Sequence, residues 1–235
     1  MFELKKSNER GHTNIDWLNS YHSFSFGEYY DPSNIHFGPL RVLNDDIIQP
    51  GQGFPTHPHS NMEIVTIILQ GTVSHKDTSG GEGTITENEI QRMTAGKGIL
   101  HSEFNASETE VLKLLQIWFI PNKQGLIPSY EQKKFSHEER KNKLLKVVSG
   151  KKEDGVIFIN QDAETFLSDL DKLKEIKYTP KENRGAYIHA IEGVINVNNY
   201  ILKDGDALKV KEEPQIIITA EADSRIILFD LPMKF

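Results

Sequence analysis

Two short pairs of residues, all of types that bind metals, limit the possible fold and function of this chain more than any other feature of the sequence. His57 and His59 are separated by one residue, as are His101 and Glu103, and both pairs lie in segments typical of β-strands. On a strand, residues two apart point to the same face, so each pair can present two ligand atoms to one ion. Three imidazoles and one carboxylate can bind a divalent transition metal and leave positions open for substrate or dioxygen. The pattern therefore predicts a metal site built for chemistry.

Composition narrows the classes of protein to consider. A structural zinc site would more often use cysteine, and the chain has none. There are 27 Lys and Arg residues against 34 Asp and Glu residues, a net charge of -7, with no basic block. Direct nucleic-acid binding is disfavoured because it needs a basic patch that neutralises phosphates. Residues 1–14 lack the apolar run of a signal peptide, and no segment approaches membrane-spanning length, so we expect a cytoplasmic protein without membrane contact.

Strand-forming segments dominate the chain up to residue 120. Residues 62–77 predict two strands joined by a tight turn at Gln70 and Gly71, and residues 111–120 form a nearly continuous apolar run, as in a strand buried on both faces. Residues 38–54 and 83–96 each carry a further strand pattern.

The stretch from 121 to 143 interrupts this pattern with prolines and charges. Ser136 followed by Glu139 has the spacing of a capping box, which predicts a short linker helix, although a solvated charged loop is an equal alternative. Residues 165–174 have a spacing compatible with a short helix, and the pattern leaves their structure open.

Strand patterns resume beyond this linker and continue to the C-terminus. Turn-prone pairs at Asn198–Asn199 and Asp204–Gly205 predict hairpins. Residues 188–197 weakly repeat the pattern of 62–73, which suggests a duplication. We therefore predict an all-β protein with two β-barrels in tandem. The expected divisions are a metal-binding unit at 1–130, whose N-terminal strand could pack on the second barrel, a linker helix at 131–145, and a second unit at 146–235.

The glycines around the histidine pairs complete a longer motif. Its positions are Gly51, His57, His59, Glu63 and Gly71, followed by Gly98, His101 and Asn105. This arrangement resembles the two cupin motifs. Residues 54–77 and 93–105 more closely resemble the pirin family, the group of two-cupin proteins that includes bacterial quercetinases. Residues 17–32 and 37–46 also resemble the bacterial, quercetinase-type branch. The resemblance covers most of 10–145 and is weak over 146–235.

The resemblance implies a bicupin fold and a set of site residues. It implies that His57, His59, His101 and Glu103 are the metal ligands, whereas many cupins use the carboxylate at the position of Glu63. It leaves Glu63 either to support the site from behind the ligands or to contact substrate. The second unit has no paired histidines, so the expected second cupin domain lacks a metal.

The activity implied by the resemblance is that of a metal-dependent dioxygenase. We expect quercetin 2,3-dioxygenase activity, in which O2 opens the flavonol ring with release of CO and Glu103 acts as the base. Iron(II) is the expected metal, with Ni, Mn, Cu or Zn as alternatives, because imidazole and oxygen ligands suit all of them.

Two alternatives for the function remain open. A pirin-like protein can instead be a metal- or redox-sensing regulator that binds a transcription factor or a metabolic enzyme, or it can act on another phenolic or enediol substrate. The remaining aromatic and imidazole side chains have an ordinary explanation as core or surface residues, which we expect for Phe24, Phe26, Trp118, His12, His22, His36, His75, His137 and His189.

Overall fold

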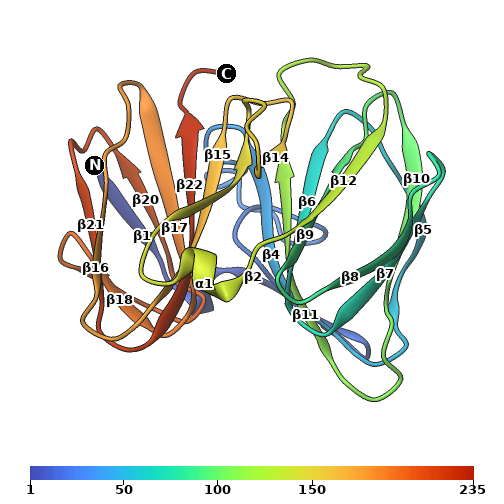
Figure 1. Cartoon of the computed structure of the whole chain (residues 1–235), viewed down its shortest axis with the longest axis horizontal. Coiled ribbons are helices and arrows are strands. Elements are labelled where there is room, and N and C mark those ends of the chain that lie inside the picture. The colour runs from blue at the N-terminus through green and yellow to red at the C-terminus, as the bar shows by residue number, and fades with distance from the viewer.

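The strands of the N-terminal half form two sheets that face each other. The computed structural model describes residues 1–235. The larger sheet has the order β12-β9-β6-β11-β4-β3-β2, made by Ser129–Lys134, Glu89–Thr94, Glu63–Gln70, Leu112–Phe119, Leu40–Ile48, Leu18–His22 and Gly11–Ile15. The smaller has the order β5-β10-β7-β8, made by Gly53–His59, Ile99–Asn105, Thr72–Asp77 and Glu82–Thr86 (Figure 1).

The C-terminal half repeats this arrangement beside the first. Its larger sheet has the order β1-β20-β17-β22-β15-β13-β14, made by Phe2–Lys5, Ala207–Lys211, Arg184–Glu192, Ser224–Pro232, Glu164–Leu170, Leu145–Ser149 and Ile157–Phe158. Its smaller sheet has the order β16-β21-β18-β19, made by Glu175–Tyr178, Ile216–Ala220, Val194–Val197 and Tyr200–Lys203. The hydrogen-bonded strands thus form two separate sheets in each unit in place of one continuous barrel.

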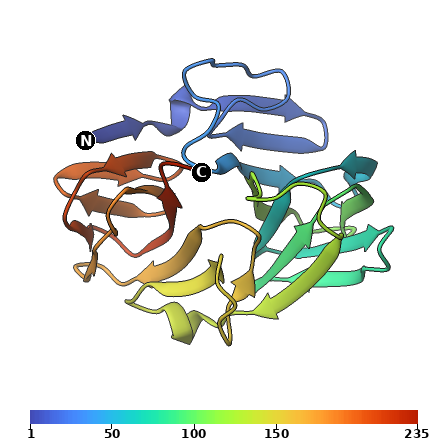
Figure 2. The same cartoon turned by 90° about the horizontal axis from the view of Figure 1, so that it is seen from above.

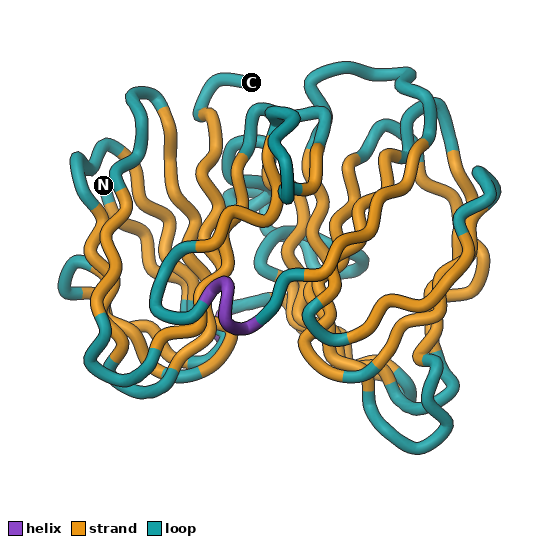
Figure 3. Tube along the Cα trace, viewed as in Figure 1, coloured by secondary structure: helices purple, strands orange, loops and turns teal.

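Helix is confined to two short pieces. A 3-10 turn, η1, covers Ser7–Glu9, and the helix α1 covers His137–Arg140, between the two units (Figure 3). Ser136 caps α1: its hydroxyl accepts from the Glu139 amide at 3.3 Å, and the Glu139 carboxylate accepts from the Ser136 amide at 2.7 Å. The capping-box prediction and the all-β prediction are both confirmed. No helix is both long enough and apolar enough to span a membrane.

The turn at Gly71 and the hairpin at Asn198–Asn199 follow the sequence predictions, whereas the hairpin predicted at Asp204–Gly205 is wrong, because β19 and β20 on either side of it belong to different sheets. Gly71, at φ +87°, joins β6 to β7, and Asn198 and Asn199, at φ 44° and 75°, join β18 to β19. Residues 165–174, which the pattern left open, contain most of strand β15, where every residue from Thr165 to Leu170 is buried. Burial on both faces explains why this segment lacks strand alternation.

The N-terminal segment links the two units. Strand β1 pairs with β20 of the C-terminal half, whereas β2 and β3 extend the larger sheet of the N-terminal half (Figure 2). The domain limits at 130 and 146 remain a proposal; β12 continues the first unit's sheet to Lys134. Across the interface, His189 Nε2 lies 3.0 Å from Asp45 Oδ1, so this histidine has a structural contact.

Apolar packing is continuous between the units. The largest cluster has 23 buried residues drawn from both, including Phe119 and Phe229, whose ring centroids are 6.0 Å apart. A second cluster of 16 residues belongs mainly to the C-terminal unit and includes Ile188, Ile195 and Leu228. Aliphatic side chains therefore occupy the space between the two sheets of that unit.

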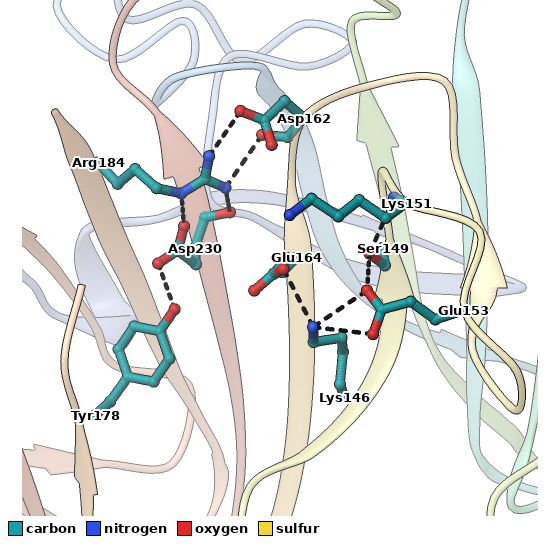
Figure 4. A network of polar contacts seen from close by, with 9 residues as sticks. All are labelled: Lys146, Ser149, Lys151, Glu153, Asp162, Glu164, Tyr178, Arg184 and Asp230. Carbon is teal, nitrogen blue, oxygen red and sulfur yellow. Dashed lines mark hydrogen bonds and ion pairs between the residues drawn. The ribbon is translucent and has the colours of Figure 1, made fainter. Parts of the chain in front are cut away.

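Charged side chains cross-link strands of the C-terminal unit (Figure 4). The Arg184 guanidinium contacts Asp230 and donates to Asp162 at 2.8 Å, and the Tyr178 hydroxyl donates to Asp230. In the same region Lys146 donates to Glu164 at 3.1 Å. These contacts join β13, β15, β16, β17 and β22, so they are structural links within this unit.

Candidate metal centre

The two residue pairs predicted from sequence lie on neighbouring strands. His57 and His59 are on β5, His101 and Glu103 are on β10, and these strands pair antiparallel with His101 directly opposite His57. The backbones of β5 and β10 are very close together at Gly53. A Cβ atom added to this glycine would lie 2.2 Å from the carbonyl oxygen of Glu103. Beside this close approach, the pairing of β10 with β5 shifts in register between His101 and Glu103.

The three histidine rings converge. Their centroids are separated by 4.4 Å for His57 and His101, 4.8 Å for His57 and His59, and 4.9 Å for His59 and His101. One ring nitrogen from each lies within 4.8 Å of the others, a geometry that could hold a metal ion.

The hydrogen bonds of these rings fit a metal. His57 Nδ1 lies 2.7 Å from the Pro55 carbonyl oxygen, so it donates its proton there and leaves Nε2 with a free lone pair. His101 is buried, and neither of its ring nitrogens has a hydrogen-bond partner. A buried polar atom without a partner is costly, and a bound cation would satisfy it.

The protonation of the histidines also suits a metal. Burial, together with repulsion from the neighbouring histidines, lowers the pKa of His59 to about 4 and that of His101 to about 3. Both rings are therefore neutral at pH 7. Neutral imidazole is the form that binds metal ions.

Glu103 adjoins this cluster and is held by two amides. Gln91 Nε2 donates to its Oε1, and Gln116 Nε2 donates to its Oε2 at 2.9 Å. One of its oxygens lies within 4.8 Å of ring nitrogens of His101 and His75. Glu103 is therefore next to His101 at the edge of the histidine cluster. His75 lies beside both residues, although we expected it to be an ordinary core residue.

A cavity of about 470 Å³ opens beside His57, His59 and Glu103. Its apolar lining includes Phe26 and Trp118, whose rings meet edge to face at 5.5 Å. Phe26 therefore lines the cavity in place of the expected core position, whereas Trp118 lines the cavity and also packs against the buried cluster of Ile64 and Met93. The remaining lining residues are Thr13, Ile15, Leu18, Ser20, His22, Gly27, Glu28, Asn44, Asp46, Phe54 and Gln116.

The polar wall of the cavity was not anticipated from sequence. Asn44 and Asp46, both buried, lie two apart on β4 and point to the same face. Burial, with the nearby charges of Asp45 and Glu103, raises the pKa of Asp46 to about 7, against the hydrogen bond from Ser20 that favours the carboxylate. On β4 the other positions of this face are Leu40, Val42 and Ile48, so two polar residues on an otherwise apolar face are the sequence signal that could have revealed them.

Glu63 is at the domain interface. Its carboxylate accepts hydrogen bonds from the Thr94 hydroxyl at 3.1 Å and from the Asn160 amide nitrogen at 3.1 Å and Nδ2 at 3.2 Å. Burial raises its pKa, although these bonds oppose the change. No hydrogen bond joins it to the histidines or to Glu103, and it does not line the cavity. The structure therefore gives it an interdomain contact in place of the expected contact with ligands or substrate.

Comparisons with known proteins agree with the geometry. Residues 3–119 match the family model described as Pirin, and residues 146–231 match the one described as Quercetinase C-terminal cupin domain. A quercetin 2,3-dioxygenase of Escherichia coli K12 is 43% identical over 99% of both chains. The chain belongs to the pirin family. The two-cupin prediction is confirmed, and the second match covers the half where the resemblance was weak.

Two further relatives extend this picture of the pirin. A protein of Pseudomonas aeruginosa described as a putative quercetin 2,3-dioxygenase is 38% identical, over 98% of this chain and 100% of that protein. The crystal structure of bacterial pirin YhhW from E. coli in complex with nickel(II) superposes with a TM-score of 0.94, at 43% identity over 99% of both chains. That relative binds a divalent metal within the same fold.

Proposed function

We propose that this pirin is a metal-dependent quercetin 2,3-dioxygenase, which opens the flavonol ring with O2 and releases CO. The observation that carries the proposal is the convergence of His57, His59 and His101 beside a cavity lined with aromatic residues. Full-length similarity to a protein named as this enzyme supports it.

The proposed ligands are His57, His59, His101 and Glu103. We propose iron(II) as the physiological metal, while the nickel(II) complex of the E. coli relative supports nickel as an alternative; Mn, Cu and Zn also suit these donors. When bound, the ion supplies Lewis acidity that makes a coordinated hydroxyl more acidic, and a redox-active ion adds reactivity toward dioxygen.

The cavity fits a flat phenolic substrate. Its volume of about 470 Å³ lies in the usual range for small-molecule sites. Phe26, Phe54 and Trp118 provide aromatic surfaces against which flavonol rings can pack, and they exclude water from the reacting end.

Glu103 is the proposed base. Both of its oxygens accept hydrogen bonds from amide groups, so the side chain is held in one orientation beside the histidines. In the proposed reaction it removes the proton of the flavonol 3-hydroxyl, which leaves an electron-rich enolate. A carboxylate that also held the metal would be a weaker base, so Glu103 would serve as the base while it is not bound to the ion.

Anaerobic loading with each metal in turn tests the proposal. The loaded protein is mixed with quercetin and O2, and flavonol loss is followed by absorbance while CO is trapped and quantified. Turnover with stoichiometric CO is the expected result. Absence of turnover with every metal would contradict the proposed enzyme activity and leave the regulatory alternative. The test of that alternative is recovery, from the native cell, of a partner protein whose binding depends on the metal.

A cytoplasmic location stays a prediction.

A further inference from the structure

His75 lies on the side of the candidate metal centre that faces away from β5. Strand β10 is flanked by β5 on one edge and by β7 on the other. On β7, His75 is directly opposite Glu103, and Asp77 is directly opposite His101. Directly opposite residues on antiparallel strands have neighbouring side chains on the same face of the sheet. The polar row that begins at His57 therefore continues through His101 to Asp77.

Asp77 fixes the orientation of His75. Oδ1 of Asp77 accepts from the Ser79 amide at 2.7 Å, the Ser79 hydroxyl at 2.7 Å and the Gly81 amide at 3.1 Å. Its other oxygen, Oδ2, lies 2.9 Å from His75 Nε2. A carboxylate held by three donors acts as an acceptor, so His75 donates from Nε2 and keeps a lone pair on Nδ1. The His75 side chain is 1% exposed and that of Asp77 is 0% exposed, so water does not compete for this bond.

The rings of His75 and His101 are neighbours and both are buried. His75 Nδ1 has no hydrogen-bond partner, and neither does either ring nitrogen of His101. The two ring centroids are 5.5 Å apart, and a ring nitrogen of each lies within 4.8 Å of the other. The structure shows no direct hydrogen bond between the two rings, so a single bridging water is the link that this separation allows. Tyr130 stacks on His75 with centroids 5.1 Å apart, which limits rotation of the ring.

We propose that His75 is a positioning residue of the metal centre, and that its Nδ1 accepts a hydrogen bond from a water molecule that in turn accepts the N–H of the His101 ring nitrogen turned away from the metal. Asp77, His75 and His101 then form a chain in which each partner sets the tautomer of the next. His101 presents a lone pair to the metal, and its ring is held in the orientation that binding requires. The inference rests on the proposed metal centre. It gives His75, a buried histidine that is not among the expected ligands, a role in that centre.

Two variants of the full chain separate positioning from packing. His75→Leu keeps an apolar filler but removes the acceptor, whereas His75→Asn keeps an amide oxygen near the position of Nδ1. Affinity for Ni(II) is measured by competition with a chromophoric chelator, and the ligand field is read from the absorption spectrum of the Co(II)-loaded protein. His36→Leu is the control, because this exposed histidine contacts only the Gly38 carbonyl and the Phe235 ring.

We expect His75→Leu to weaken metal binding by about 10–100-fold, the usual effect of losing such a partner, and to shift the Co(II) bands. His75→Asn should recover most of the affinity and the spectrum. Equal affinity and spectra for wild type and His75→Leu would overturn the inference. Equal losses in both variants would also overturn it, because they would indicate a packing role.

Pulsed EPR of the Cu(II)-loaded protein distinguishes positioning from ligation. The number of coordinated imidazoles should be the same in wild type and His75→Leu. A decrease by one would make His75 a ligand and refute the positioning role. If the wild type bound no divalent metal, the proposed metal centre itself would fail, whereas equal affinities in a metal-binding wild type and His75→Leu would refute this inference alone.

Discussion

Gln116 donates from Nε2 to Oε2 of Glu103 at 2.9 Å, across the space between the two sheets of the N-terminal unit. Gln91 donates to the other oxygen, Oε1. The Thr66 hydroxyl accepts from Gln91 Nε2 at 3.0 Å and lies 3.1 Å from Gln116 Oε1, which ties the two amides together. Glu103 is thus the centre of a buried network that requires an acceptor at both of its oxygens.

Replacing Glu103 with Gln should impair activity more than metal content. The new amide group would place donors against the amide of Gln91 or Gln116, and the base would be lost. We expect turnover per bound metal to fall by about 10²–10⁴-fold. Steady-state rates, divided by metal content measured in the same sample, provide the comparison.

Glu63→Gln is the matched control for that experiment. Glu63 is also fully buried, but its partners are Thr94 and Asn160 at the interface. We expect normal metal content, an unchanged rate per metal, and a loss of stability of about 1–3 kcal/mol, because one amide donor would face another. If Glu63→Gln lost more activity per metal than Glu103→Gln, the base assignment would pass to Glu63.

Removing a proposed ligand should abolish metal binding and leave the fold intact. His101→Ala, His57→Ala and His59→Ala each delete one imidazole, whereas the apolar clusters that stabilise the unit lie elsewhere. Metal analysis after gel filtration and circular dichroism spectra check the two halves of this prediction. A variant that retained a full equivalent of metal would remove its residue from the site.

The ligand pairs could be predicted from sequence because they depend only on local geometry. A one-residue spacing within a strand places His57 and His59 on one face, whichever strands lie beside it. The helix at Ser136 was predictable for the same reason, since both hydrogen bonds of its cap lie within four residues. The pairing of β5 with β10 does not follow from local geometry, and it was the family resemblance that indicated that the two residue pairs meet.

Residues that depend on distant contacts were not predictable. The role of Glu63 depends on its hydrogen bonds with Asn160, which lies 97 positions further along the chain. Phe24 and Phe26 were both expected to be ordinary core or surface residues, but they lie outside the named strands, where the alternation of strand faces does not apply. Phe24 packs on Tyr187 in the interdomain core, whereas Phe26 lines the cavity. His75 gave no signal of its own, because its role depends on which strand lies beside β10.

This pair of phenylalanines provides a test of the substrate cavity. Phe26→Leu removes an aromatic surface from the cavity, so the KM for a flavonol should rise by roughly 2–10-fold, as expected for loss of one aromatic contact. Phe24→Leu should leave KM unchanged and reduce the free energy of unfolding by about 1–3 kcal/mol. Steady-state kinetics and urea unfolding on both variants make the comparison. A similar KM in wild type and Phe26→Leu would argue against flavonol binding in this cavity.

Acid should weaken the contact between the linker helix and the C-terminal unit. Asp169 is bound by Arg140 Nε at 2.6 Å, His137 Nδ1 at 2.6 Å and Arg225 Nε at 3.2 Å. Burial favours the neutral carboxyl, but the hydrogen bonds from Arg140 and His137 and the charges of Arg140 and Arg225 outweigh it and lower the pKa of Asp169 below its usual value. A lowered folded-state pKa stabilises the protein above the unfolded pKa of about 3.9, and this contribution disappears as the pH falls through the folded pKa. The difference in unfolding free energy between the metal-free wild type and Asp169→Asn, measured with urea, should therefore be largest from pH 5 to pH 7 and should shrink as the pH falls below about 3.9. A difference that stayed constant down to pH 2 would show that the charge of Asp169 does not stabilise this contact.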